Sequence, residues 1–349
     1  MADPAPVRYR AADLESWTAA VFRAAGTTDA DAGTIARALV RSDLRGYRTH
    51  GLTRVASYVQ RFAEGEFNPR PRIDVQTREG TIVVDADGAL GHVAAPVAQA
   101  AAQAQLAARG QVFVAVRECG HLGALGLHAL AAAEHGMFCI LGQRTPPLLA
   151  MEGFTEPGIG HNPIAFGCPV AGRDPLVFDI ACSVAARGHI LLAAREGRPI
   201  PAGWAVDRHG RPTTDAREAA DGMLLPAGGH KGVGIAMMVE CLAGAFTATA
   251  DSLERFVARV PAAGAVGRQG AFFWFLDPGG FAGRAVFDAY TARWTGIYEG
   301  AGGRLPGTRG ARLERAGRAD GLALAPDIER ELRALGERLG IPFPPAPAA

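Results

Sequence analysis

Two polar residues near the amino terminus, His50 and Arg54, have the types and spacing that chemistry on a small acid requires. The spacing predicts a helix from about Thr49 to Phe62, which would place both side chains on one helical face, four residues apart. A histidine can give a proton to a carbonyl oxygen near neutral pH, and an arginine can hold a carboxylate by two parallel hydrogen bonds. The pair therefore indicates a site for a 2-oxo acid, although a helix-start histidine beside a solvated arginine would show the same spacing.

A glycine-rich turn carries the only lysine of the chain, Lys231. Lysine and arginine together number 36, so 36 − 1 leaves 35 arginines. A position that keeps lysine against this background indicates a need for a compact ammonium group rather than a planar guanidinium. Glycines at 228, 229, 232 and 234 would let backbone amides approach a ligand closely. The segment predicts a phosphate-holding turn that is not a Walker loop, and a glycine turn with a solvated lysine is the alternative.

Three further segments place polar residues where strands end or chains turn. His121 follows the predicted strand Val112–Val116, and His161 with Asn162 stands between a glycine and a proline. A third predicted strand ends in Asp179, and Ser183 follows where a helix is expected to start, so that its amides could hold a phosphate or a carboxylate. Ordinary turns and a serine helix cap would explain the same residues.

Motifs of several common enzyme classes are absent. The sequence has no GxGxxG dinucleotide fingerprint after a strand, no Walker pattern, no GxSxG elbow and no HExxH. Its five cysteines form no CxxC pair, which favours buried thiols over a zinc site or a disulfide framework. We expect no metal site.

Composition narrows the location and the partners. The chain has 349 residues, 48% of them hydrophobic, which suffices for one globule of two intertwined lobes. A net charge of +1 gives no electrostatic reason to expect nucleic acid. No apolar run is long enough for a bilayer, and the start of the chain lacks a signal-peptide pattern, so we expect a cytoplasmic protein that does not bind membranes.

Hydrophobic periodicity predicts alternating helices and strands. We expect helices over 11–25, 29–41, 49–62, 92–109, 122–135, 183–195, 228–248, 281–298 and 325–339. We expect a hairpin over 73–85 and strands over 112–116, 138–141, 176–180 and 271–276. The stretch 142–175 is rich in Gly and Pro and is predicted to form loops around short strands.

Taken in order, these segments resemble the type 2 malate/L-lactate dehydrogenase family over about residues 14–342. The motifs that carry the resemblance are Thr49-His50-Gly51 with Arg54, His121-Leu122-Gly123, Gly160-His161-Asn162-Pro163, Asp179 through Gly188, Pro201-Ala202-Gly203-Trp204, Pro212-Thr213-Thr214-Asp215, Gly228 through Gly232, and Arg304-Leu305-Pro306-Gly307. Each motif is weak alone, whereas the ordered set is specific.

The resemblance implies a homodimer with a non-Rossmann α/β (mixed α+β) fold. A large mixed or antiparallel sheet would be flanked by helices, with a helical lobe from residues 1–75 and 280–349 and a cofactor and substrate lobe from 76–279. It also implies an oxidoreductase that transfers hydride between NAD or NADP and a 2-oxo or 2-hydroxy acid, or a cyclic imino acid.

Site residues follow from the matched motifs. His50 resembles the proton donor, His121 a second acid/base residue, and Arg54 the substrate-carboxylate ligand beside Thr49. Asp179 and Lys231 complete the expected catalytic set. The expected cofactor contacts are Thr145, His161, Asn162, Asp179, Ile180, Ala181, Ser183, His230, Lys231, Pro306 and Gly307.

Departures from the family pattern gather in residues 119–161. Cys119-Gly120 replaces Ser-Asn, Arg144 replaces an Asn, residues 150–154 replace an APxGG turn, and His161 replaces the Thr of GTNP. They predict an altered cofactor or substrate pocket. Two other hypotheses stay open: a catalytically silent protein that binds a small acid or nucleotide, and a metal-dependent hydrolase using His50, His121 and His161.

Overall fold

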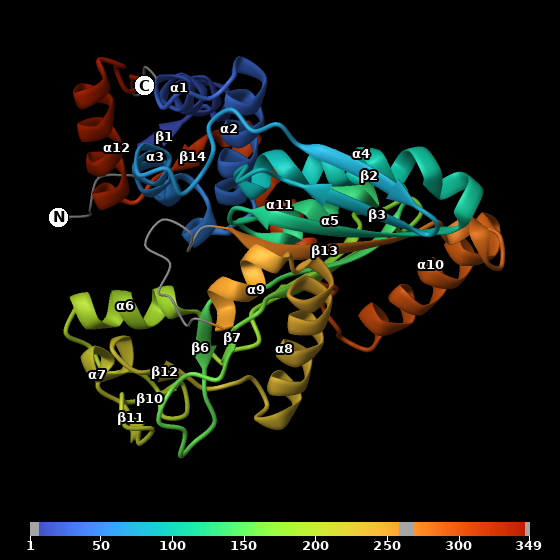
Figure 1. Cartoon of the computed structure of the whole chain (residues 1–349). Helices are drawn as coiled ribbons and strands as arrows, with labels where there is room; N and C mark the ends of the chain where they lie inside the picture. Colours follow the sequence, from blue (N-terminus) through green and yellow to red (C-terminus); the bar gives the residue numbers. More distant parts are fainter. Residues whose placement is uncertain (1–6, 258–267, 346–349) are drawn as a thin grey trace.

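A seven-stranded mixed sheet forms the centre of the computed structural model, which describes residues 7–257 and 268–345 (Figure 1). The strand order is β2-β3-β4-β13-β5-β8-β9, and β3 with β4 is the one parallel pair in this sheet of the described chain. The strands are β2 (Asp74–Arg78), β3 (Thr81–Asp85), β4 (Gln111–Cys119), β13 (Gln269–Leu276), β5 (Phe138–Gln143), β8 (Ile164–Cys168) and β9 (Leu176–Ile180). The expected mixed α/β fold class is confirmed.

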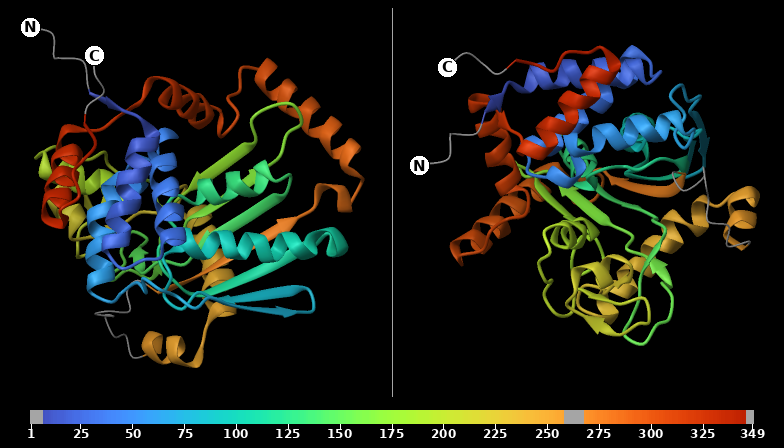
Figure 2. Two further views of the ribbon diagram at one scale, coloured as in Figure 1. Left: turned by 90° about the horizontal axis from the view of Figure 1, so that it is seen from above. Right: turned by 90° about the vertical axis from the view of Figure 1, so that its left-hand side faces the viewer.

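Helices cover both faces of this sheet. Successive side chains of a strand point to opposite faces, and both faces carry apolar side chains that need to be covered. On β13, Phe273 and Phe275 join the core beneath α4 (Gly91–Arg109) and α5 (Leu125–Glu134). Phe272 points the other way and packs with Val239 of α8 (His230–Ala243). Figure 2 shows α4 and α5 lying along one side of the sheet and α8 on the opposite side.

The helical lobe is built from both ends of the described chain. The two-residue strands β1 (Arg8–Tyr9) and β14 (Leu322–Ala323) pair antiparallel and hold the two ends together. The helices of this lobe are α1 (Ala11–Ala24), α2 (Asp29–Leu44), α3 (Val55–Ala63), α11 (Thr308–Asp320) and α12 (Pro326–Leu339). They enclose a separate core that includes Trp17, Phe22 and Leu335.

A smaller five-stranded sheet, ordered β11-β10-β12-β6-β7, lies below the large one (Figure 1). Its strands are β6 (Pro147–Leu149), β7 (Ile159–Gly160), β10 (Ala205–Val206), β11 (Pro212–Thr213) and β12 (Met223–Leu224). The neighbouring helices are α6 (Arg187–Arg195) and α7 (Ala216–Ala220), and α9 (Ala250–Val257) follows α8 along the chain. Ile190 of α6 and Ala236 of α8 share a core with this sheet.

Helix α10 (Arg284–Gly300) packs on the large sheet and lies at the end away from α1 and α12 (Figure 1). Its Glu299 forms an ion pair with Arg173, and Phe287 packs against a cluster that contains Val170 and Leu176. The expected lobe division stays a proposal, and these contacts favour a boundary after α10 rather than at residue 280.

Several expectations about helices differ from the structure; the short helices α7 and α9, for example, were not predicted. The helix predicted from Thr49 is interrupted, and the helix predicted from Ser183 begins at Arg187. Helix α11 was not predicted, because its sequence has few apolar residues to form a periodic stripe. Within the described ranges, no helix combines the length and the apolar character needed to cross a bilayer.

Candidate active site

His50 lies on a tight turn whose shape depends on Gly51 and Asp43. Two 3-10 turns, η1 (Arg48–His50) and η2 (Leu52–Arg54), replace the predicted start of the helix. The Asp43 carboxylate accepts a hydrogen bond from the Leu52 amide at 2.7 Å, and a methyl group on Gly51 would overlap that carboxylate. The prediction that His50 and Arg54 share an α-helical face was therefore wrong, since a buried long-range contact breaks the helix there.

The turn nevertheless keeps His50 and Arg54 together. The Arg54 Nε donates to the Thr49 carbonyl at 2.7 Å, and the Thr49 hydroxyl lies 2.9 Å from Nδ1 of His50. No carboxylate of the described residues pairs with Arg54, so its guanidinium is a half-buried cation without a counter-ion. A half-buried cation of this kind favours binding of an anion.

His121 lies beside His50, with ring centroids 5.6 Å apart and planes 32° from parallel. Its Nδ1 is 2.6 Å from the hydroxyl of Tyr58, which lies on α3. Sequence reasoning missed Tyr58, because it reads as a core aromatic residue of an apolar helical stripe. The available signal was its position four residues after Arg54, which itself lies four residues after His50.

A third imidazole, that of His161, reaches the same place from between β7 and β8. Its Nδ1 lies 3.1 Å from the Thr145 hydroxyl. The Asn162 side chain accepts from the Thr145 amide at 2.9 Å and donates to the Ala236 carbonyl at 3.0 Å. The Asn162 amide thus joins this loop to α8, and its backbone has a φ of 24°.

Asp179 is the penultimate residue of β9 and accepts a hydrogen bond from the Gly126 amide at 2.7 Å, in the first turn of α5. Burial raises the pKa of Asp179 to about 6, and the Gly126 hydrogen bond lowers it. Burial and then the Asp179 charge raise the pKa of Tyr47. A methyl group on Gly126 would overlap the Tyr47 hydroxyl and press on Asp179, so glycine allows these groups to meet. Tyr47 is a second site residue that sequence reasoning missed.

The electrostatics of the site keep its imidazoles neutral. Burial, then Arg54 and His161, lowers the pKa of His50 to about 4. Burial and then Arg187 lowers the pKa of His161 to about 4. Burial, followed by the charges of His50 and Arg54, holds the pKa of His121 well below its ordinary value. These mutual effects show that groups from distant parts of the sequence share one site.

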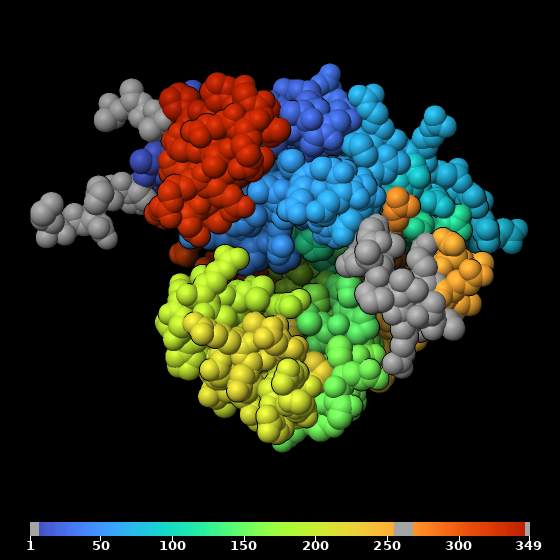
Figure 3. All heavy atoms as spheres, turned by 60° about the vertical axis from the view of Figure 1, so that its left-hand side comes forward, coloured from blue at the N-terminus to red at the C-terminus, as the bar shows by residue number. Residues whose placement is uncertain are grey.

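The first turn of α6 closes this site from the side of the smaller sheet. The Cα of Gly188 faces Thr49, since a methyl group there would lie 3.7 Å from Thr49 Cγ2. The Arg187 guanidinium donates to the Ala220 carbonyl at 3.4 Å and pairs with no carboxylate among the described residues. Figure 3 shows the blue region of α3 facing the yellow-green region of α6 across a narrow hollow.

Lys231 lies in the first turn of α8, exposed and without a carboxylate partner in the described part of the chain. Behind it, Gly232 packs on the Cys182 carbonyl, which accepts from the Ala227 amide at 2.8 Å. The Cys182 amide in turn donates to the His161 carbonyl at 2.9 Å. Backbone hydrogen bonds of Cys182 therefore connect the segment that carries Lys231 to His161.

The remaining expected cofactor residues fall into two groups. The first group follows Asp179 along the chain and contains Ile180, Ala181 and Ser183, whose buried hydroxyl donates to the Ala185 carbonyl at 2.8 Å. It also includes His230, which is exposed at the start of α8. Pro306 and Gly307 lie at the other end of β9, where the Val177 amide donates to the Pro306 carbonyl at 3.1 Å. Edge strand β9 thus connects the two groups.

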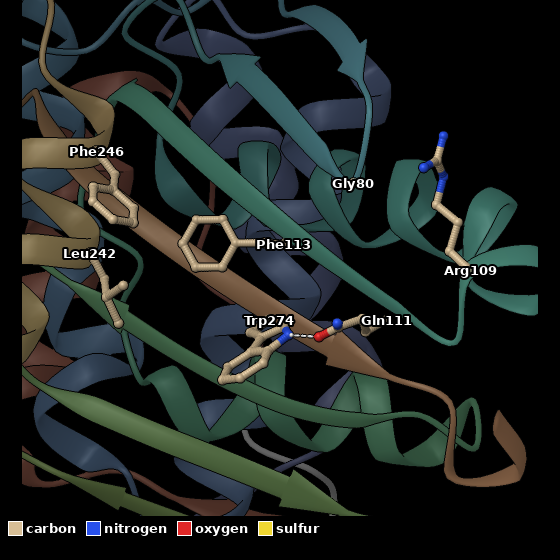
Figure 4. A pocket seen from close by; sticks show the side chains of 7 residues that line it. All are labelled: Gly80, Arg109, Gln111, Phe113, Leu242, Phe246 and Trp274. Atoms are coloured by element: carbon tan, nitrogen blue, oxygen red, sulfur yellow. Dashed lines mark hydrogen bonds between the residues drawn. The ribbon is translucent and has the colours of Figure 1, made fainter. Parts of the chain in front are cut away.

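A hollow of about 560 Å³ lies elsewhere, on the outer face of the large sheet (Figure 4). Phe113, Phe246 and Trp274 line it, and the Trp274 indole donates to Gln111 at 3.0 Å. None of the predicted site residues lines this hollow. No group of three or more His, Cys, Asp or Glu is placed to hold a metal ion in the described ranges.

Comparison with known proteins identifies the family of this chain and supports its fold. The sequence profile of the malate/L-lactate dehydrogenase family matches residues 9–333. The (2R)-3-sulfolactate dehydrogenase (NADP(+)) of Chromohalobacter salexigens is 34% identical over 324 residues, covering 92% of this chain and 96% of that protein. The Δ1-pyrroline-2-carboxylate/Δ1-piperideine-2-carboxylate reductase of Pseudomonas putida is 32% identical over 340 residues, covering 96% and 97%.

Solved structures agree. Δ1-piperideine-2-carboxylate reductase from Pseudomonas syringae superposes with a TM-score of 0.86 at 30% identity, over 94% of this chain and 99% of that one. Sulfolactate dehydrogenase from Methanocaldococcus jannaschii gives 0.85 at 27% identity, over 97% and 98%. The fold and site define an oxidoreductase. The chain belongs to the malate/L-lactate dehydrogenase family, as its motifs indicated.

Proposed function

We propose that this protein reduces a small 2-oxo acid or cyclic imino acid with NADH or NADPH, and catalyses the reverse oxidation. The observation that carries this proposal is the Arg54 guanidinium, half-buried beside His50 and unpaired with any carboxylate of the described chain. A substrate carboxylate is the natural counter-ion for such a group. Relatives named for sulfolactate, pyrroline-carboxylate and piperideine-carboxylate all act on substrates with a carboxylate next to the reacting carbon.

The residues of this chain fit a nicotinamide dinucleotide along β9. Lys231 offers an unpaired ammonium at a helix start near Ser183, and Gly307, with a φ of 97°, lets the backbone turn closely against Val177. Phosphates bind at such glycine-rich helix starts. When bound, the cofactor supplies the hydride. Pro306 and Gly307 would hold one end of it, and His230 and Lys231 with residues 179–183 the other. Thr145 and His161 would contact it from the opposite side.

The side chains divide the remaining work. Arg54, beside Thr49, would orient the carboxylate, and His50 would exchange the proton with the substrate oxygen or nitrogen. His121 would contact the same reacting atom. Asp179, near the end of β9, would supply a negative charge to the site. The three histidines are half-buried, so bound substrate and cofactor would cover them and exclude water from the reacting carbon.

The test is turnover on a panel. Oxidation of NADH and NADPH is followed with pyruvate, oxaloacetate, sulfopyruvate, Δ1-pyrroline-2-carboxylate and Δ1-piperideine-2-carboxylate. His50→Ala should lower kcat/KM by about 10²- to 10⁴-fold, the usual contribution of a general acid. His209→Ala, which changes an exposed histidine of the β10–β11 turn, is the matched control and should retain activity.

A catalytically silent homologue is the competing function, motivated by the changes at residues 119–161. One of these changes is already compensated: Arg144 pairs with Glu240 at 2.6 Å, and Glu240 also accepts from Asn162. Cofactor binding by calorimetry without turnover of any panel member would favour the silent homologue over the enzyme.

We further propose that the protein is a homodimer. Helix α10 carries an apolar stripe of Val286, Tyr290, Trp294 and Ile297, with exposed fractions of 58%, 71%, 38% and 60%. A contiguous exposed apolar patch of this kind is typical of a protein interface. Tyr290→Glu should lower the sedimentation coefficient toward that of a monomer, while Ala292→Glu, on the opposite flank of α10, should not.

A further inference from the structure

The hydroxyl of Tyr58 makes one hydrogen bond in the described chain, to Nδ1 of His121 at 2.6 Å. Tyr58 is 1% exposed, so no bulk water replaces that partner. If Nδ1 carried the ring proton, it would donate to the phenol oxygen and leave the phenol proton buried without an acceptor, which is unfavourable. The hydroxyl therefore donates and Nδ1 accepts.

We propose that Tyr58 is a positioning residue that holds His121 as the tautomer with its proton on Nε2. This inference deepens the proposed function and rests on it. A neutral imidazole has one donor and one acceptor nitrogen, and the hydrogen bond made by one nitrogen fixes the role of the other. His121 is thereby a hydrogen-bond donor toward the reacting oxygen or nitrogen, and His50 is the residue that exchanges the proton.

The surroundings fix the Tyr58 ring in place. It packs edge-on against Phe67, with centroids 5.9 Å apart, and against His92 at 6.1 Å. His92 is 1% exposed, and neither of its ring nitrogens has a hydrogen-bond partner. His92 could compete for the phenol proton, but no hydrogen bond joins it to Tyr58.

The protonation states of the pair agree with this arrangement. Burial raises the pKa of Tyr58 to about 12, so the phenol keeps its proton throughout the working range. The pKa of His121 is lowered by burial first, and then by His50, Arg54, His92 and Arg61. Its ring therefore stays neutral, and the single ring proton can lie on either nitrogen. Because Tyr58 follows Arg54 by one turn of α3, the segment that presents the carboxylate ligand also sets the His121 tautomer.

The experiment compares Tyr58→Phe with the wild-type protein. Tyr9→Phe is the matched control, since Tyr9 is also 1% exposed and its hydroxyl donates to Glu329 at 2.7 Å, in the helical lobe away from the site. In ¹⁵N-histidine-labelled wild-type protein, with His121 assigned through a His121→Gln variant, Nδ1 should resonate as a non-protonated nitrogen and Nε2 as a protonated one. Tyr58→Phe should give a mixture of tautomers, and Tyr9→Phe should leave the wild-type pattern.

Kinetics provide the second measurement. Loss of one positioning hydrogen bond should lower kcat/KM for the acid about five- to twenty-fold in Tyr58→Phe. The Kd of the reduced cofactor and the thermal midpoint should stay close to those of Tyr9→Phe. A protonated Nδ1 in the wild-type protein would overturn the proposal, as would an unchanged tautomer and an unchanged kcat/KM in Tyr58→Phe. If the wild-type protein turns over no substrate, the proposed function fails, and the spectra still decide the tautomer.

Discussion

Replacing Gly51 by alanine should displace the turn that carries His50. The φ of Gly51 is −99°, so this residue does not occupy the left-handed region that favours glycine. The cause is steric, because the new methyl group would overlap the carboxylate of Asp43. Burial raises the pKa of that carboxylate to about 7, and the carboxylate holds the Leu52 amide at 2.7 Å.

The cost can be worked from these contacts. Losing a hydrogen bond to a charged or partly charged group costs about 1.5–3 kcal/mol. Overpacking a buried site adds about 1–3 kcal/mol, so the free energy of unfolding should fall by about 3–5 kcal/mol. A catalytic group displaced by about 1 Å can lose about 10²-fold in rate, and kcat/KM should fall by about that factor.

Thermal unfolding and steady-state kinetics measure both effects. Gly296→Ala is the control, since the same change on α10 meets no atom within 4 Å and should be neutral or slightly stabilising. In an Asp43→Ala background the obstacle is gone, and Gly51→Ala should then cost less than about 1 kcal/mol. A full cost in that background, or wild-type stability and activity for Gly51→Ala alone, would refute the steric explanation.

Further predictions concern pH and the helical lobe. Burial lowers the pKa values of His50, His92 and His161 to about 4, 3 and 4, so between pH 4 and 6.5 the unfolded chain binds more protons at these residues than the native one. The raised pKa values of Asp43 and Asp179, about 7 and 6, act in the opposite direction in this window. Urea titrations should therefore show the free energy of unfolding falling by roughly 1–2 kcal/mol per pH unit below pH 6.5, with a shallower slope for His92→Leu but not for the exposed His209→Leu. Glu314→Gln should lower the free energy of unfolding by about 3 kcal/mol, since Glu314 pairs with the buried Arg45 at 2.8 Å; Glu331→Gln, an exposed change on α12, should not.

Local patterns in the sequence predicted the elements whose stability comes from their own periodicity. Helix α2 was expected over residues 29–41, and it begins at Asp29, where the Thr28 hydroxyl accepts from the Asp31 amide. Strands β9 and β13 were predicted because apolar runs, residues 176–178 and 271–276, make up most of each strand. Helix α11 was missed, because its position depends on Glu314 pairing with Arg41 and Arg45 of α2, some 270 residues earlier in the chain. No local pattern contains such a contact.

In the candidate site, too, local patterns predicted some residues, while others depend on contacts that are distant in sequence. Motif order indicated His50, Arg54, His121, His161 and Asp179; the first four lie together, and Asp179 contacts Gly126 beside Tyr47. The groups that orient them were not visible: Asp43, Tyr47 and Tyr58 each act through a contact with a residue that is distant in sequence or in a different turn. A tyrosine within an apolar stripe shows its hydroxyl partner only once the strands and helices are assembled.

Charge explains how such a site can be ready for reduction although its imidazoles are neutral. Burial lowers the pKa values of His50 and His161 most, and Arg54 and Arg187, which lack carboxylate partners in the described chain, lower them further. A bound carboxylate would offset the Arg54 charge and remove that smaller part of the His50 shift, while burial would still hold the pKa of His50 below its ordinary value. If His50 exchanges the proton as proposed, a bound acid would make its protonated form more accessible than it is in the empty site. In the proposed reverse direction the low pKa of His50, about 4, keeps the imidazole neutral and able to accept the proton of a hydroxyl group.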